Sequence, residues 1–337
     1  MSEFLLELYS EEIPPQLQIN ARNQLKQLME KSLKNEGVNY KACLEYSSPT
    51  RLSIYIKGLP ENIKIKPNEI RGPKVGVEKN ILEGFMKSRN VSTKDLFKKS
   101  TEKGDFYFIK TLEKNILVAN LLATILPKAI AEISWKKSMK WSTNNLMWGR
   151  PLRSIFAIFN SKKLLFKVQH LESCDYVIIE QNLVTKSKKI KNFNEYQSFL
   201  KTNKIILDQN ERKKIILKRF DSVIKLKNYK QQYNDRLLEE VVNIVEDPNV
   251  LLVNFDKDYL KIPNEIIIST LEKHQRYFPI FDSREKLTNQ FFVVANKKDE
   301  KKLITEGNKR VVEARLADAK FFWDKDRSKN LIKQIGN

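Results

Sequence analysis

Apolar and polar side chains alternate over short stretches at the start of the chain, the pattern of a β-strand with two different faces. Residues 4–8 and 52–56 show this alternation, and residues 43–46 form a shorter candidate strand. Between them, residues 17–33 carry apolar side chains at helical spacing, which predicts a helix that ends before Gly37. The order strand, helix, strand, strand indicates an α+β fold.

The same patterns continue along the chain. Further strands are predicted at residues 106–111, 155–159, 164–168, 176–179, 250–253, 277–281 and 290–295. Helices are predicted as two short pieces within 79–98, then at 117–135 with a break at Pro127, at 208–228, at 237–245 and from 262–270 onward. Residues 60–75 are predicted to be a basic loop that contains proline.

These elements predict two lobes, each made of short mixed or antiparallel sheets covered by helices. The first lobe is expected to span residues 1–170 and the second residues 171–326. Residues 327–337 are predicted to start a helix that leads into C-terminal domains absent from this sequence.

The most regular helical pattern lies near the C-terminus, in residues 307–323. Val312, Leu316, Ala319 and Trp323 recur at i, i+4, i+7 and i+11, which places them on one face of a helix. That face is predicted to dock on a core, with the intervening charged side chains in solvent.

Composition narrows the class of protein. The chain has 337 residues with 41% hydrophobic side chains, enough for two domains with proper cores. No apolar run approaches the ~18 residues of a membrane span, and the N-terminal stretch lacks the features of a signal peptide. Cys43 and Cys174 lie far apart, which argues against a disulfide framework. We therefore expect a cytoplasmic protein with no membrane contact.

The net charge of +21 is compatible with a polyanionic partner, because clustered Lys and Arg displace counterions from phosphate. A bias toward A/T-rich codons would give the same abundance of Lys, Ile and Asn without any functional cause. Charge alone leaves both explanations open.

Several catalytic classes find no support in the sequence. It contains two histidines, His170 and His274, which excludes histidine-rich metal sites, and it has neither a GxGxxG nor a GxxxxGK[ST] motif. The adjacent carboxylates Glu11–Glu12 and Glu239–Glu240 point apart in any regular structure, so a solvated surface is the better interpretation of both pairs. We expect no catalytic residue and no metal or cofactor site on this chain.

Two segments interleave cations with aromatic side chains. In the first, Trp135, Trp141 and Trp148 alternate with Lys and Arg up to Arg153. Such a segment can hold a nucleic-acid backbone while stacking on its bases, or its tryptophans can fill the core while the cations extend to solvent. The second segment, Lys273 to Pro279, contains His274 and Arg276, which are candidates for phosphate or ribose contact or for a purely structural role.

Read together, six groups of residues make the chain resemble the N-terminal half of the β subunit of bacterial tetrameric glycyl-tRNA synthetase. The groups are Leu5 to Pro15, Ser48 to Ile54, Arg71 to Lys74, Met139 to Trp141 with Arg150-Pro151, Leu237 to Pro279, and Glu306 to Asp326. The sequence departs from the family at Glu180 to Leu183, where a Gly-His-Arg segment is usual, and this puts a contact at that place in doubt.

The resemblance implies a ligase in which a separate alpha subunit uses ATP with Mg²⁺ and glycine, while the beta subunit engages tRNA(Gly) in an alpha2beta2 assembly. In that family the beta chain continues through an HD-type domain and an anticodon-binding domain. Part of the family's N-terminal region is also similar to the editing-type domain of the phenylalanyl enzyme. Two points argue against hydrolytic editing by this chain: no water-activating group is evident, and amino acids larger than glycine can be excluded sterically. The alternatives are an assembly half that docks the alpha subunit and a stand-alone nucleic-acid-binding protein.

Basic residues in the family-like segments are the candidates for contact with the tRNA backbone. They are Arg71, Lys74, Lys140, Arg150, Arg153, His274, Arg276 and Arg310.

Overall fold

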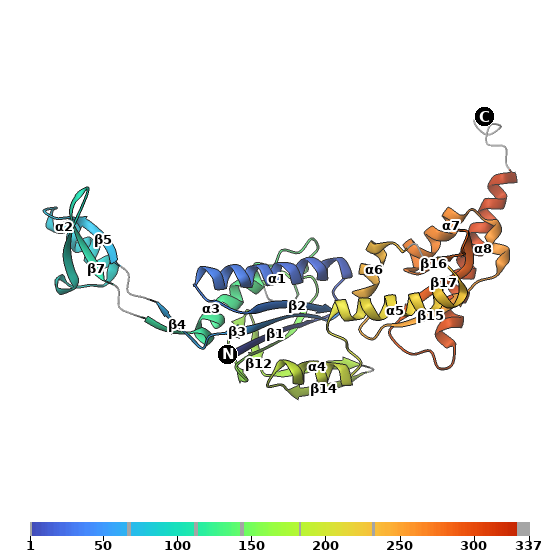
Figure 1. The fold of residues 1–337 in the computed structure, drawn as a ribbon, viewed down its shortest axis with the longest axis horizontal. Coiled ribbons are helices and arrows are strands. Elements are labelled where there is room, and N and C mark those ends of the chain that lie inside the picture. Colours follow the sequence, from blue (N-terminus) through green and yellow to red (C-terminus); the bar gives the residue numbers. More distant parts are fainter. Residues whose placement is uncertain are drawn as a thin grey trace, which may run out of the picture.

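A computed structural model describes residues 2–65, 69–110, 114–141, 145–181, 183–230 and 233–328. Figure 1 shows an elongated molecule with a central sheet, a small unit at one end and a C-terminal unit at the other. Helices alternate with small mixed and antiparallel sheets, so the predicted α+β class is confirmed. No helix in the described ranges is both long and apolar enough to cross a membrane.

The central sheet is built around β1 (Ser2–Ser10), which lies between β3 (Arg51–Leu59) and β9 (Leu152–Phe159) and pairs antiparallel with both. Strand β2 (Ala42–Ser48) continues the sheet beyond β3. On the other side β12 (Leu171–Cys174) runs parallel to β9, with β10 (Lys162–Lys163) and β11 (Lys167–Val168) as short edge strands.

Both faces of this sheet are covered, so nearly every residue of β1 is buried. Helices α1 (Pro15–Asn35) and α3 (Val118–Ala131) cover the face that carries Phe4, Leu6 and Leu8. Helix α4 (Phe193–Thr202) and the hairpin β13 (Tyr176–Gln181)–β14 (Val184–Lys189) belong to a second core, which contains Leu5, Phe156 and Tyr196.

The second core extends through Ile205 and Leu207. The residues from β12 to Leu207 therefore pack on the central sheet. The domain boundary expected between residues 170 and 171 lies within the part of the chain that forms this sheet and its second core. The division of the chain into two domains stays a prediction.

A small unit is connected to the central sheet by a two-stranded antiparallel ribbon, in which β4 (Asn62–Ile65) pairs with β8 (Lys114–Leu117). It contains the sheet β5 (Glu69–Lys74)–β7 (Gly104–Lys110)–β6 (Leu96–Thr101), helix α2 (Lys79–Arg89) and the short turn η1 (Thr93–Asp95). The predicted loop at 60–75 thus holds two strands. Their pairing partners lie more than thirty residues away, so local sequence patterns miss them.

The C-terminal unit is a three-stranded antiparallel sheet in which β17 (Leu287–Ala295) lies between β15 (Asn249–Asn254) and β16 (Phe278–Phe281). Helices α5 (Gln209–Lys227) and α6 (Asp235–Val242) cover one face, where Phe220 stacks on Phe292 at 4.5 Å.

The other face of that sheet is covered by η2 (Lys257–Lys261), α7 (Asn264–Ser269), the π-helical turn η3 (Thr270–His274) and α8 (Leu303–Ser328). Val312 and Leu316 of α8 are fully buried, as the helical pattern predicts, whereas Trp323 is only partly buried.

Candidate nucleic-acid interface

The eight candidate cations do not form one site. Arg71 and Lys74 belong to the small unit, whereas His274, Arg276 and Arg310 belong to the C-terminal unit at the opposite end of the molecule. The remaining three, Lys140, Arg150 and Arg153, lie in the tryptophan segment and at the start of β9. Any RNA that touches all of them must extend along the whole protein.

In the small unit, cations cover aromatic rings. The Cζ atom of Arg71 lies 3.6 Å from the centre of the Phe106 ring. Cross-strand pairing places Arg71 opposite Phe108 and Lys74 opposite Phe106, so all four side chains share one face of the sheet. Phe106 is more than 90% buried while Arg71 is exposed, so the Arg71 guanidinium lies over the ring and keeps part of its surface in solvent.

The tryptophan segment is mainly structural. Trp148 is fully buried, and its Nε1 donates a hydrogen bond to Ser10 Oγ at 3.1 Å. The ring centroids of Trp135 and Trp148 are 4.8 Å apart, and a Cβ atom at Gly149 would lie 2.5 Å from the Trp135 ring. Trp141 is also partly buried against the same core. The core-filling interpretation is therefore correct for Trp148, which is inaccessible to a base.

The cations of that segment reach solvent, as the same interpretation expects. Lys140 and Arg150 are exposed, and Arg150 donates to the carbonyl of the preceding Gly149 at 3.2 Å. Neither side chain forms an ion pair with the residues that the structure describes.

Arg153 is held by its own chain. It forms a bidentate pair with Glu180, in which Nη2 donates to Oε1 at 3.0 Å, and it lies 3.4 Å from Glu11. Tyr9 donates to Glu180 as well, at 3.1 Å. Burial, to which the charge of Glu180 adds, raises the pKa of Tyr9 to about 12. An incoming phosphate would have to compete with two carboxylates for Arg153.

In the C-terminal unit the three candidates differ in availability. Arg276 Nε donates to Glu240 at 2.7 Å, and its Nη1 donates to the Lys273 carbonyl, so its charge is largely satisfied. His274, at the end of the π-helical turn, and Arg310, on α8, are exposed. Glu240 and Glu11 are thus partners of arginines, a role that their position in adjacent carboxylate pairs does not indicate.

A buried polar network lies between the inner strands β1 and β3 of the central sheet and helix α4, and the sequence pattern does not reveal it. Arg51 Nε donates to Glu7 at 3.1 Å, and Tyr196 Oη donates to the same carboxylate at 2.5 Å. Tyr196 also shares a hydrogen bond of 2.9 Å with Ser53. Burial, followed by the negative charge of Glu7, raises the pKa of Tyr196 well above its usual value. The only sequence signal is a carboxylate in the middle of an apolar strand.

The joint between the central and C-terminal units is also polar and buried. Gln18 Nε2 donates to the carbonyl of Asn243 at 2.8 Å, and Arg212 Nη2 donates to the carbonyl of Ser47 at 2.8 Å. Ser48 Oγ donates to Glu246 at 2.8 Å. These hydrogen bonds cross the joint and hold the two units in a defined orientation, while Gln18 Oε1 and Arg22 Nε are buried there without a partner among the described residues.

A cleft of about 620 Å³ opens beside this joint. Tyr9, Arg51 and Glu180 line it from the central unit, and residues of the loop after β17 line it from the C-terminal unit. The Arg51 guanidinium is held by the protein: its Nη1 donates to Thr50 Oγ1 at 2.7 Å and its Nη2 to the carbonyl of Ile178 at 2.5 Å.

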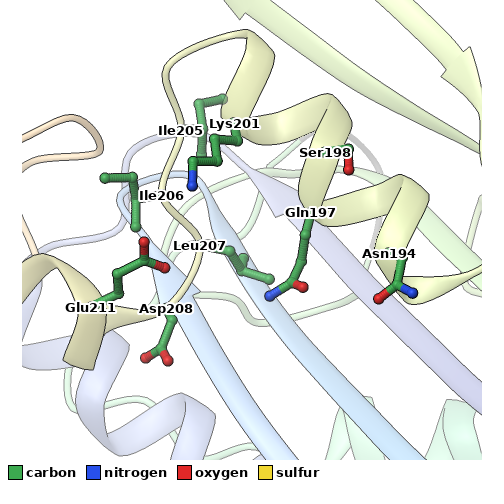
Figure 2. A pocket seen from close by; sticks show the side chains of 9 residues that line it. All are labelled: Asn194, Gln197, Ser198, Lys201, Ile205, Ile206, Leu207, Asp208 and Glu211. Carbon is green, nitrogen blue, oxygen red and sulfur yellow. The ribbon is translucent and has the colours of Figure 1, made fainter.

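Figure 2 shows a smaller pocket of about 320 Å³, between α4 and the start of α5. Lys201 of α4 and Glu211 of α5 lie on opposite sides of it. Asp208 caps α5 by accepting from Asn210 N at 2.8 Å, so this carboxylate has a structural task. Within the described residues, no group of three or more His, Cys, Asp or Glu side chains could hold a metal ion.

Comparison with known sequences gives consistent results. A sequence model of the family described as glycyl-tRNA synthetase beta subunit matches residues 4–337. The chain is 33% identical over 330 residues to the glycine–tRNA ligase beta subunit of Dictyoglomus turgidum, an alignment that covers 96% of this chain and 48% of the relative. For the Rickettsia felis protein of the same name the identity is 33% over 341 residues, covering 100% and 51%. The Rickettsia bellii protein is 34% identical over 333 residues, covering 98% and 50%. The chain thus spans about half the length of these relatives.

Proposed function

The chain belongs to the glycyl-tRNA synthetase beta-subunit family, and from this premise we propose that it is a tRNA-engaging part of a glycine–tRNA ligase. In this proposal it supports the attachment of glycine to tRNA(Gly) by a separate alpha subunit in the cytoplasm. The observation that carries the proposal is similarity along the whole chain, at 33% identity over 96% of its length.

The division of labour follows from the same premise. ATP with Mg²⁺ and glycine are assigned to the alpha subunit, and this chain supplies RNA-binding surface rather than a reacting group. The full assembly is proposed to be alpha2beta2. The exposed cations found in all three units of the fold support a contact with a long polyanion.

Among the eight candidates, the surrounding contacts separate two roles. Lys140, Arg150 and Arg310 are exposed and without a carboxylate partner among the described residues, so they are proposed to contact phosphate directly. Arg153 and Arg276 already pair with Glu180 and Glu240, and a phosphate would have to displace those pairs. They are proposed to position their neighbours.

The remaining three are assigned by their surroundings. Arg71 and Lys74 are proposed to bring the small unit to RNA, since both are exposed and lie on one face of its sheet. His274, in the C-terminal unit, is proposed to bind phosphate or ribose of a different part of the RNA.

Glycylation of tRNA(Gly) by the purified alpha subunit tests the proposal, with this chain or a beta chain of the relatives' full length added. Rescue by the 337-residue chain places essential contacts within it. Rescue by the longer chain alone moves the necessary RNA contact elsewhere in the beta subunit. Failure of both to support charging rejects the ligase function.

A second candidate function, docking of the alpha subunit, draws on an apolar surface of α8. Phe321 and Phe322 are 61% and 59% exposed and contact each other edge to face. Size-exclusion chromatography of this chain with the alpha subunit distinguishes the roles. A stable complex that binds no tRNA supports assembly, whereas tRNA binding without the alpha subunit supports RNA engagement.

A further inference from the structure

The cleft beside the joint of the two units carries cations that the sequence segments do not single out. Lys204 reaches it from the turn after α4, and Lys297 and Lys298 reach it from the loop after β17. All three are exposed, and none of them forms an ion pair in the described parts of the chain. Residues more than ninety positions apart thus bring three free positive charges to one cleft.

The carboxylates of the same cleft are partly neutralised. Glu180 is paired with Arg153, and Glu246 accepts from Ser48 and lies 3.7 Å from Arg51. Only Glu12 and Glu300 face the three lysines without such a partner among the described residues. Among the side chains of the cleft without such a partner, three lysines therefore face two carboxylates.

The backbone that presents these lysines is held in place. Asn296 Oδ1 accepts from the backbone N–H groups of Glu246 and Asp247 at 2.8 and 3.0 Å, which fixes the start of the loop. At the other end, Asp299 accepts from Ile304 N and Thr305 N at 3.0 and 2.8 Å and so caps α8. Fixing the backbone lowers the entropy lost when the loop binds a ligand.

The positive surface continues beyond the cleft. Lys298 also lines a neighbouring hollow of about 390 Å³, together with Asp299 and the exposed Arg219 of α5, which forms no ion pair with the described residues. Two adjacent hollows that share a lysine suit successive charges of a polymer better than one small anion. Ile244, 44% exposed, gives the cleft an apolar wall against which a ribose or base can pack.

We propose that this junction cleft binds a stretch of tRNA backbone, with phosphates on Lys204, Lys297 and Lys298 and the path continuing toward Arg219. This inference rests on the proposed function, and it adds a contact surface made jointly by the central and C-terminal units.

The test compares two triple variants of the full chain, each of which loses three positive charges. The cleft variant carries Lys204→Gln, Lys297→Gln and Lys298→Gln. The control carries Lys31→Gln, Lys34→Gln and Lys128→Gln, which are exposed lysines on α1 and α3. Affinity for labelled tRNA(Gly) is measured by fluorescence anisotropy at several salt concentrations.

The cleft variant is expected to bind at least ~10-fold more weakly than the control, with a salt slope smaller by about 2–3, since each lost phosphate contact removes about 0.7–0.9. Equal losses in the two variants overturn the inference. Absence of binding by the unaltered chain instead rejects the proposed function.

Chemical protection gives a second measurement that needs no variant. Bound tRNA should protect Lys204, Lys297 and Lys298 from an amine-acylating reagent and leave Lys31, Lys34 and Lys128 reactive. Unchanged acylation of the three cleft lysines in a saturated complex contradicts the proposed path of the RNA.

Discussion

Replacing Arg51 by methionine removes the cation that neutralises Glu7 inside the central unit. Both side chains are 2% exposed, and Arg51 makes hydrogen bonds to Glu7, Thr50 and the Ile178 carbonyl. The variant would leave Glu7 buried with Tyr196 as its remaining side-chain donor. An uncompensated buried charge of this kind costs about 3–5 kcal/mol.

Urea unfolding, followed by circular dichroism and by tryptophan fluorescence, measures this loss. Trp148 is a suitable reporter because it is buried in the same unit. Lys163→Met is the matched control, since Lys163 pairs with Glu172 at 3.4 Å on the surface, with side chains 38% and 46% exposed, and such a pair contributes only about 0–1 kcal/mol.

A double variant, Arg51→Met with Glu7→Leu, isolates the interaction. Removing both charges leaves Tyr196 with its partner Ser53, so the double variant should recover most of the about 3–5 kcal/mol lost in Arg51→Met alone. If Arg51→Met costs no more than Lys163→Met, the account of this network as a mutually dependent buried pair is refuted.

Three further predictions test other parts of the structure. Gly149→Ala should destabilise the protein by about 1–3 kcal/mol and alter its tryptophan fluorescence, because the added Cβ would lie 2.5 Å from the Trp135 ring. Gly84→Ala on α2 is the control in the same urea titration: its Cβ meets open space, so the change should be neutral or stabilising. Burial raises the pKa of the Cys43 thiol to about 12, so iodoacetamide at pH 8 should leave Cys43 unmodified in the native protein and alkylate it in urea; rapid native labelling would contradict this. Residues 66–113 can be replaced by an Asn-Gly turn, because Ile65 and Lys114 are already paired across the ribbon. The melting temperature of the central unit should stay unchanged, and the salt dependence of tRNA binding should become less steep. A salt dependence equal to that of the intact chain would show that the small unit does not contact the RNA.

The sequence alone predicted the elements whose pattern is local. The buried face of α8 at Val312 and Leu316 follows from helical spacing, and the strands β1 and β3 follow from alternation. Family membership was also accessible, because six short segments in a fixed order are improbable by chance, although each is weak by itself.

The candidate cations were predictable as residues but not as charges available to RNA. Nothing in the local sequence of Arg153 indicates that Glu180, twenty-seven positions later, neutralises it, and the same holds for Arg276 and Glu240. The tryptophan segment is similar, since an aromatic residue among lysines is compatible with both core and surface until its packing is known. Trp148 lies in the core.

What only the tertiary structure decided are the contacts between distant segments. Residues from β12 to Leu207 join the first sheet because their apolar side chains complete a core with Leu5 and Phe156. The junction cleft exists because the turn at Lys204 and the loop at Lys297 meet beside a buried polar joint. The periodicity of a sequence shows which side of a helix or strand is apolar, and this determines local structure. Which apolar face packs on which, and which charges pair, depends on how the whole chain packs.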